Sequence, residues 1–170
     1  MIRELVPGDS ICGILINHKY PTATDQARKL EGAAAKIGRN ILIVEASDDA
    51  ELKAAFGALL QKRVGVLVVV WDPLIESRRR RIIDFAAENR LPDIYQLKDF
   101  AVNGALISYG PAISDIYRQV GVYPGRNLKG AKPSDLPVVL PTKYELVINL
   151  KTANAIGVKV PASLLVKPTR

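Results

Sequence analysis

Five polar or aromatic side chains stand at or shortly after the ends of apolar segments of this 170-residue chain, where they could bind a small molecule. In chain order they are Asn17, Tyr20, Asp72, Ser108 and Tyr109. Together they offer an amide, a carboxylate, hydroxyls and two aromatic rings, which suit hydrogen bonding and stacking. The carboxylate of Asp72 could also pair with the ammonium group of an amino acid. We therefore interpret these residues as candidate ligand-binding groups.

Each candidate also has an ordinary structural role. Asp72 precedes a proline and suits the cap position of a helix that begins there. Asn17 can close its own turn, which is common for asparagine. Ser108 and Tyr109 can line a hinge, and Tyr20 can be a loop side chain at the surface. The sequence alone leaves both interpretations open for all five residues.

Catalytic and metal-binding groups are scarce. The chain has one histidine, His18, and one cysteine, Cys12, so it is poorly supplied for nucleophilic catalysis. His18 has no second ligand at metal-binding spacing, and no phosphate loop, nucleophile elbow or zinc motif occurs. We therefore expect a protein that is not an enzyme and that needs no metal or cofactor.

The net charge of +7 raises the question of nucleic-acid binding. The basic residues are dispersed, and only Arg78 to Arg81 form a block. Four consecutive positions on a helix point around its whole circumference and form no groove-facing stripe. No recognised nucleic-acid motif accompanies them. We expect a solvated helix face and no nucleic-acid partner.

Residues 11–108 alternate short apolar segments with amphipathic segments. Apolar segments that predict strands cover 11–16, 41–45, 64–71, 94–96 and 105–108. The longest, 64–71, has no polar face, as expected of a parallel strand covered on both sides, and we expect Trp71 to pack in the core. Helical spacing between the segments predicts an α/β fold. It consists of a parallel sheet of about five strands sandwiched by helices, in the order 2-1-3-4-5.

The pattern changes after Gly110. Ile113 begins a helix, but Gly121, Pro124 and Gly125 are expected to weaken or break it before residue 128. The segment 129–141 contains three prolines and predicts no regular element. A strand at 144–148 and a short helix at 149–156, ended by a glycine, follow. The C-terminal part is therefore expected to be irregular.

The parallel sheet explains why the candidate residues belong together. The carboxyl ends of parallel strands meet at one edge of a sheet, and ligands bind there in open α/β folds. Helix N-termini at this edge present free N–H groups that suit a carboxylate. The sequence thus predicts that the five candidates gather on one rim.

Three segments carry a resemblance to a known family. They are GALISYGP at 104–111, LKGAKPSDLP at 128–137 and PTKYELVINLKTA at 141–153. In this order and spacing they resemble ABC-transporter substrate-binding proteins of the tryptophan-binding type, which have the type I periplasmic-binding fold. The resemblance implies a small-molecule ligand such as an amino acid, an ABC permease as partner, and a periplasmic or extracytoplasmic location. Residues 1–10 carry three charged side chains and no apolar segment, so we do not expect them to be a signal peptide.

The resemblance also implies a division into lobes. Residues 1–106 would form the second lobe, 107–142 a crossover belonging to the first lobe, and 143–170 a return segment on the second lobe. Most of the first lobe is then expected to be absent from this chain. Segment 113–140 would expose apolar surface, which a homodimer would cover.

Two other functions remain compatible with the pattern. Sugar-responsive repressors share this fold, so the chain could be the effector-binding lobe of a transcriptional regulator. A small flavodoxin-like signalling domain or enzyme is the other alternative. It would need an acidic or phosphate-binding pocket at the strand ends, where the sequence offers only Asp72.

Overall fold

The computed structural model describes residues 6, 8–128, 130, 132 and 140–165. The strands are β1 (Cys12–Ile16), β2 (Ile41–Glu45), β3 (Val66–Val69), β4 (Asp93–Tyr95), β5 (Ile107–Pro111) and β6 (Tyr144–Ile148). The helices are α2 (Ala23–Lys36), α3 (Asp49–Gln61), α4 (Pro73–Ser77), α5 (Arg79–Glu88), α6 (Lys98–Val102), α7 (Ile113–Leu128), α8 (Leu150–Ile156) and α9 (Ala162–Leu165). None of the described helices is long and apolar enough to cross a bilayer.

The six strands form one sheet in the order β2-β1-β3-β4-β5-β6. The first five pair in parallel, which confirms the α/β fold class and the order 2-1-3-4-5. β6 extends the sheet by pairing antiparallel to β5, with Tyr109 opposite Leu146. The sheet is therefore mostly parallel, and its last strand runs back along β5.

Helices cover both faces of the sheet and create two apolar clusters. On one face Leu15 and Leu67 pack with side chains of α3, α5 and α6. On the other face Ile14 and Val66 pack with side chains of α2 and α8. Successive residues of a strand point to opposite faces, so each buried strand must be apolar throughout. This explains why 64–71 has no polar face.

Three helix ends are formed by residue types that suit a helix cap. Asp48 accepts hydrogen bonds from the N–H groups of Ala50 and Glu51 at the start of α3. Asp72 accepts one from Ile75 at the start of α4, and Gly157 ends α8 in a left-handed conformation. Side-chain oxygens and glycine satisfy the free backbone groups at helix ends, which fixes where these helices start and stop.

The expected break in the helix after Ile113 is wrong. α7 runs without interruption from Ile113 to Leu128, with Pro124 inside it. A proline removes one N–H group from the helix, and the carbonyl that loses its partner is that of Val120. Val120 is exposed, so water can hydrate this carbonyl. The expected irregular segment 129–141 lies mostly outside the described residues.

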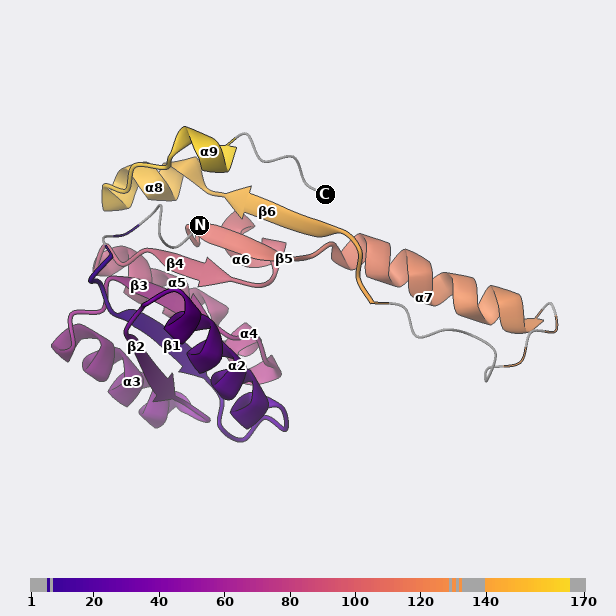
Figure 1. Cartoon of the computed structure of the whole chain (residues 1–170), viewed down its shortest axis with the longest axis horizontal. Helices are drawn as coiled ribbons and strands as arrows, with labels where there is room; N and C mark the ends of the chain where they lie inside the picture. The colour runs from indigo at the N-terminus through magenta and orange to yellow at the C-terminus, as the bar shows by residue number, and fades with distance from the viewer. Residues whose placement is uncertain (1–5, 7, 129, 131, 133–139, 166–170) are drawn as a thin grey trace.

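α7 projects away from the sheet as a helical arm (Figure 1). Its first turn is anchored by Asp115, whose carboxylate is 2.7 Å from Arg118 and 3.5 Å from Lys143. The hydrogen bond from Arg118 is the main reason that the pKa of Asp115 is lowered. Lys143 precedes β6, so this ion pair joins the base of the arm to the strand that returns from it.

Candidate functional site

The first two candidates follow β1. The side-chain oxygen of Asn17 accepts a hydrogen bond of 3.0 Å from the N–H of Lys19, and its carbonyl accepts one from Tyr20. Asn17 therefore closes its own turn. Tyr20 is half-buried against the cluster that contains Ile14 and Ile16. Both residues lie at the carboxyl edge of the sheet, with their contacts in the described structure made to their own loop or to the core.

Asp72 lies at the same edge, just after β3. It is 2% exposed, and one carboxylate oxygen accepts the 2.8 Å hydrogen bond from Ile75 that caps α4. The other oxygen is buried and has no hydrogen-bond partner among the described residues. Asp72 is therefore a helix cap, and a ligand can reach its second oxygen only if the side chains that cover it move.

Ser108 and Tyr109 lie on opposite faces of β5. Ser108 is in register with Tyr95 and only 1% exposed, and its hydroxyl has no partner within the described part of the chain. Tyr109 is half-exposed, and its ring stacks on that of Tyr144 with the ring centres 5.9 Å apart. Neighbouring residues of a strand alternate between faces, so these two candidates cannot contact one ligand group from the same side.

A hollow of about 670 Å³, which we call the rim hollow, opens at the carboxyl ends of β3, β4 and β5. Its lining consists of Trp71, Gln96, Leu97, Lys98, Asp99, Gly110, Pro111, Ile113, Ser114, Tyr117 and Glu145. None of the five sequence candidates belongs to it. Its lining combines aromatic and aliphatic surface with a few polar groups, as is usual for small-molecule sites.

Trp71 departs from its expected role. It packs partly against the core, yet it is half-buried and lines the rim hollow. Gln96 was not singled out, although it directly follows β4 just as Asp72 follows the apolar segment containing β3. Its position directly after an apolar strand is therefore the sequence feature by which Gln96 could have been identified.

Charged groups of both signs face the rim hollow. Lys98 and Asp99 come from the first turn of α6, and Glu145 comes from β6. None of the three forms an ion pair with another described residue. The first turn of α7 adds the positive end of a helix dipole at Ser114. These charges suit a ligand that carries both an amino and an acidic group.

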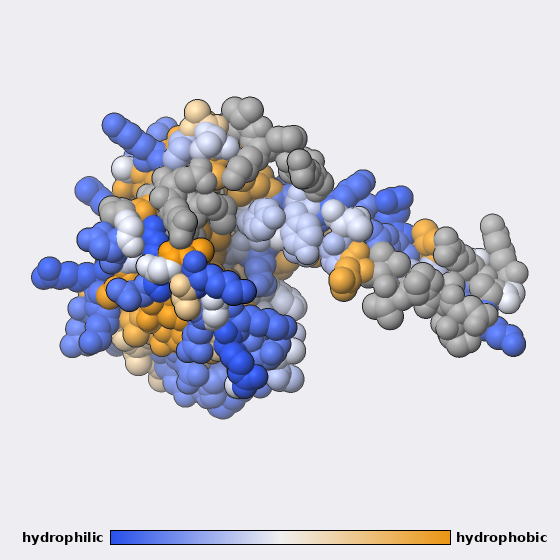
Figure 2. Space-filling view, in the orientation of Figure 1, coloured by the Kyte–Doolittle hydropathy of each residue, from blue (hydrophilic) through white to orange (hydrophobic). Residues whose placement is uncertain are grey.

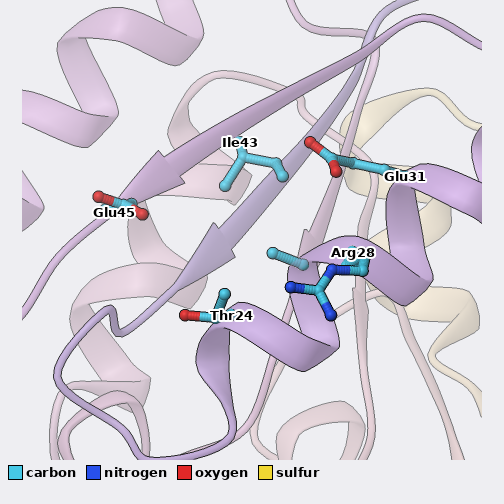
Figure 3. A pocket seen from close by; sticks show the side chains of 6 residues that line it. Thr24, Arg28, Glu31, Ile43 and Glu45 are labelled. Atoms are coloured by element: carbon cyan, nitrogen blue, oxygen red, sulfur yellow. The ribbon is translucent and has the colours of Figure 1, made fainter.

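A second hollow, of about 530 Å³, lies between α2 and the edge strand β2 (Figure 3). Thr24, Arg28 and Glu31 face it from the helix, and Ile43 and Glu45 face it from the strand. It is a more open groove than the rim hollow and lies at the far side of the sheet from β5. We therefore take the rim hollow as the candidate site. No group of three or more potential metal ligands occurs among the described residues.

Comparisons with known proteins identify the family to which the chain belongs. A family model described as "ABC transporter substrate binding protein" matches residues 1–170. No curated protein matches the sequence. A conserved domain protein from Vibrio cholerae has a solved structure that superposes with a TM-score of 0.86 at 25% identity. This match covers 96% of the present chain and 55% of the other.

Two further solved structures share the fold. The ABC domain from Streptococcus pneumoniae in complex with L-Trp superposes with a TM-score of 0.82 at 24% identity, covering 96% of this chain and 55% of that one. The ligand-free, open structure of CD0873, a substrate-binding protein with adhesive properties from Clostridium difficile, gives 0.74 at 22% identity, with 95% and 54% covered. The present chain thus spans about half the length of these solved proteins.

Proposed function

The chain belongs to the family of ABC transporter substrate-binding proteins, and on this basis we propose that it is the solute-binding component of an ABC importer. The family match favours this role over a regulator's effector lobe or a flavodoxin-like enzyme. Proteins of this kind hold a small molecule and present it to a membrane permease, so the proposed partner is an ABC permease. The corresponding location is periplasmic or otherwise extracytoplasmic.

The rim hollow is the observation that carries the proposal. It lies where ligands bind in open α/β sheets, at the carboxyl ends of parallel strands. One wall comes from the body of the sheet through Trp71 and Gln96, and the other from the base of the arm through Ile113 and Tyr117. A solute in the hollow would therefore contact both the body and the arm.

We propose an amino acid as the ligand class. Asp99 and Glu145, which pair with no cation among the described residues, would attract an ammonium group, while Lys98 and the N-terminus of α7 favour a carboxylate. Trp71 supplies apolar surface for a side chain. The L-Trp complex of the Streptococcus pneumoniae domain is consistent with this class, although its identity to the present chain is only 24%.

None of the five sequence candidates lines the rim hollow. We propose that Asn17, Tyr20, Asp72, Ser108 and Tyr109 contribute to the site only where a ligand or a second lobe extends beyond the hollow. The division into residues 1–106, 107–142 and 143–170 belongs to the same proposal, with 107–142 crossing to the other lobe. β5 begins at Ile107 and still lies in the sheet, so the crossing itself would start after Pro111.

Calorimetric titration of the chain with each common amino acid tests the proposal. Trp71 is the only tryptophan of the chain and lines the hollow, so a bound ligand should also change its fluorescence. Gln96→Ala should weaken binding, whereas Gln61→Ala, at the exposed end of α3, should leave it unchanged. Binding heat without any change in Trp71 emission would place the site elsewhere, and no binding by any amino acid would refute the ligand class.

A further inference from the structure

The direction of α7 depends on contacts at its base. The helix stands out from the body of the molecule (Figure 2). Asp115, in its first turn, is 8% exposed, whereas Tyr117 is 72% exposed and Leu128 89%. Beyond Asp115, the described side chains of α7 are all half-buried or exposed. A helix held mainly at one end can tilt about that end, and a few residues there act as the hinge.

Lys143 contacts the base of the arm twice. Its carbonyl oxygen accepts a hydrogen bond of 2.9 Å from the N–H of Ala112, the residue before α7. Its ammonium group lies 3.5 Å from the carboxylate of Asp115, three residues further along the chain. One contact alone leaves a pivot, whereas two contacts at different points restrict the rotation about it. Because Lys143 precedes β6, both contacts tie the arm to the sheet.

The Asp115 carboxylate has two further partners, and both belong to α7 itself. Arg118 donates a hydrogen bond of 2.7 Å to it, and Gln119 donates one of 2.8 Å. These residues follow Asp115 by three and four positions, so they are neighbours on one helix and do not fix its direction. Among the described residues, Lys143 is therefore the partner that ties this carboxylate to another segment.

Asp115 and Lys143 stand beside the rim hollow without lining it. Ser114 and Tyr117, one residue before and two residues after Asp115, line the hollow from α7. Glu145, two residues after Lys143, lines it from β6. The ion pair thus joins the two segments whose side chains form this end of the hollow.

A small tilt of the arm is enough to change the hollow. Along the helix axis, Tyr117 lies about 8 Å from Ala112 and Asn127 about 22 Å. A tilt of about 10° at the base would therefore move Tyr117 by about 1 Å and Asn127 by about 4 Å. A displacement of about 1 Å is enough to loosen a binding site.

We propose that the ion pair between Asp115 and Lys143 is a latch that fixes the direction of α7 and thereby positions the Tyr117 wall of the rim hollow. Both are positioning residues, because they act on a solute through the lining and do not touch it. The inference rests on the proposed function, in which the hollow binds a solute. In the proposed division into lobes, the chain leaves the sheet after Pro111 and returns at Lys143, so the latch joins the outgoing and returning segments.

Distances between spin labels measure the direction of the arm without any solute. The labels are attached at Lys53→Cys, exposed on α3, and at Asn127→Cys, near the end of α7, in a Cys12→Ala background. The distance distribution should be narrow with Lys143 in place. Lys143→Gln should broaden it or shift it by about 4 Å. Lys143→Arg keeps a cation and should restore the narrow distribution.

Arg118→Gln is the matched control. It also removes a cation from the Asp115 carboxylate, but one that belongs to the same helix. The Arg118 side chain is 69% exposed and that of Lys143 is 61% exposed, so the two changes are similar in setting. Arg118→Gln should leave the label distances unchanged. An unchanged distribution in Lys143→Gln, or an equal change in Arg118→Gln, would overturn the latch.

Calorimetric titration with each common amino acid tests the effect on the hollow. Lys143→Gln should weaken binding of the best-bound amino acid about two- to fivefold, as expected for the loss of a partly exposed ion pair. Lys143→Arg and Arg118→Gln should bind like the wild type. Wild-type affinity in Lys143→Gln would overturn the positioning role. If none of the proteins binds an amino acid, the proposed ligand class fails, while the label distances still decide whether the latch exists.

Discussion

The backbone N–H of Leu106 donates a hydrogen bond of 2.7 Å to the carboxylate of Asp93, which is 2% exposed. Asp93 begins β4, and Leu106 precedes β5, so a side chain joins the two strands just before their backbone ladder starts. Burial raises the pKa of Asp93 to about 6, and the bond from Leu106 opposes this rise only in part. The charged carboxylate is therefore costly at neutral pH.

The contribution of Asp93 to the stability of the fold should consequently fall as the pH rises from about 4 to about 6. The folded chain holds the Asp93 proton more tightly than the unfolded chain, whose pKa is near the ordinary value of 3.8. The contribution of Asp93 is then fully present below pH 4 and is lost as the pH passes the folded pKa. The difference corresponds to about 3 kcal/mol. Asp93→Asn can still accept from Leu106 but does not titrate, so its urea-unfolding free energy should lack this decrease. Parallel pH curves for the two proteins would contradict the assignment.

Replacing Asp72 should separate its cap role from its charge. Asp72→Ala removes the acceptor for the Ile75 N–H and should cost about 1–2 kcal/mol of unfolding free energy. Asp72→Asn keeps an acceptor oxygen and should cost much less. Asp48→Ala, which removes the exposed cap of α3, is the control. Chemical denaturation measures the unfolding free energy of all three variants. Equal losses of unfolding free energy for Asn and Ala at position 72 would show that the charge of Asp72, and not its cap hydrogen bond, stabilises the fold.

Gly110→Ala should destabilise the chain and alter the rim hollow. A side chain at Gly110 would lie within 2.0 Å of the Gln96 carbonyl oxygen, which belongs to the backbone and cannot move aside cheaply. Overpacking of this kind costs about 1–3 kcal/mol. Gly121→Ala, in open space on α7, should instead stabilise by about 0.5–1 kcal/mol. Thermal unfolding checks both, and a stable Gly110→Ala protein would mean that β4 and β5 separate easily.

Replacing Tyr117 or Tyr109 with alanine should show which of the two side chains contributes more to the affinity for the solute. Tyr117→Ala removes an aromatic wall of the rim hollow and should weaken binding about tenfold, since the loss of such apolar contact costs about 1–2 kcal/mol. Tyr109→Ala removes an equally large ring that lies outside the hollow. Calorimetry with the best-bound amino acid measures both. A larger loss for Tyr109 would favour the rim predicted from the sequence over the hollow.

Local chemistry was predictable wherever neighbouring residues determine it. Asp72 and Gly157 mark a helix start and a helix end because a side-chain oxygen and a left-handed glycine act within their own turn. Pro124 shows where such reasoning fails. A proline costs a helix one hydrogen bond, but this helix projects into solvent, where water can replace the bond.

The sequence predicted the edge of the sheet where the site lies but not the side chains that line it, and the reason is geometric. The sequence by itself determined the parallel order of strands and therefore the edge where Asp72 and Gln96 lie, because apolar periodicity and short connections leave few topologies. Only the tertiary structure decided which side chains face a shared space. Ser108 is buried in the core, while Tyr117, on a projecting helix, lines the rim hollow together with Trp71. Strand register and helix direction set these orientations, and both depend on contacts between segments far apart in the chain.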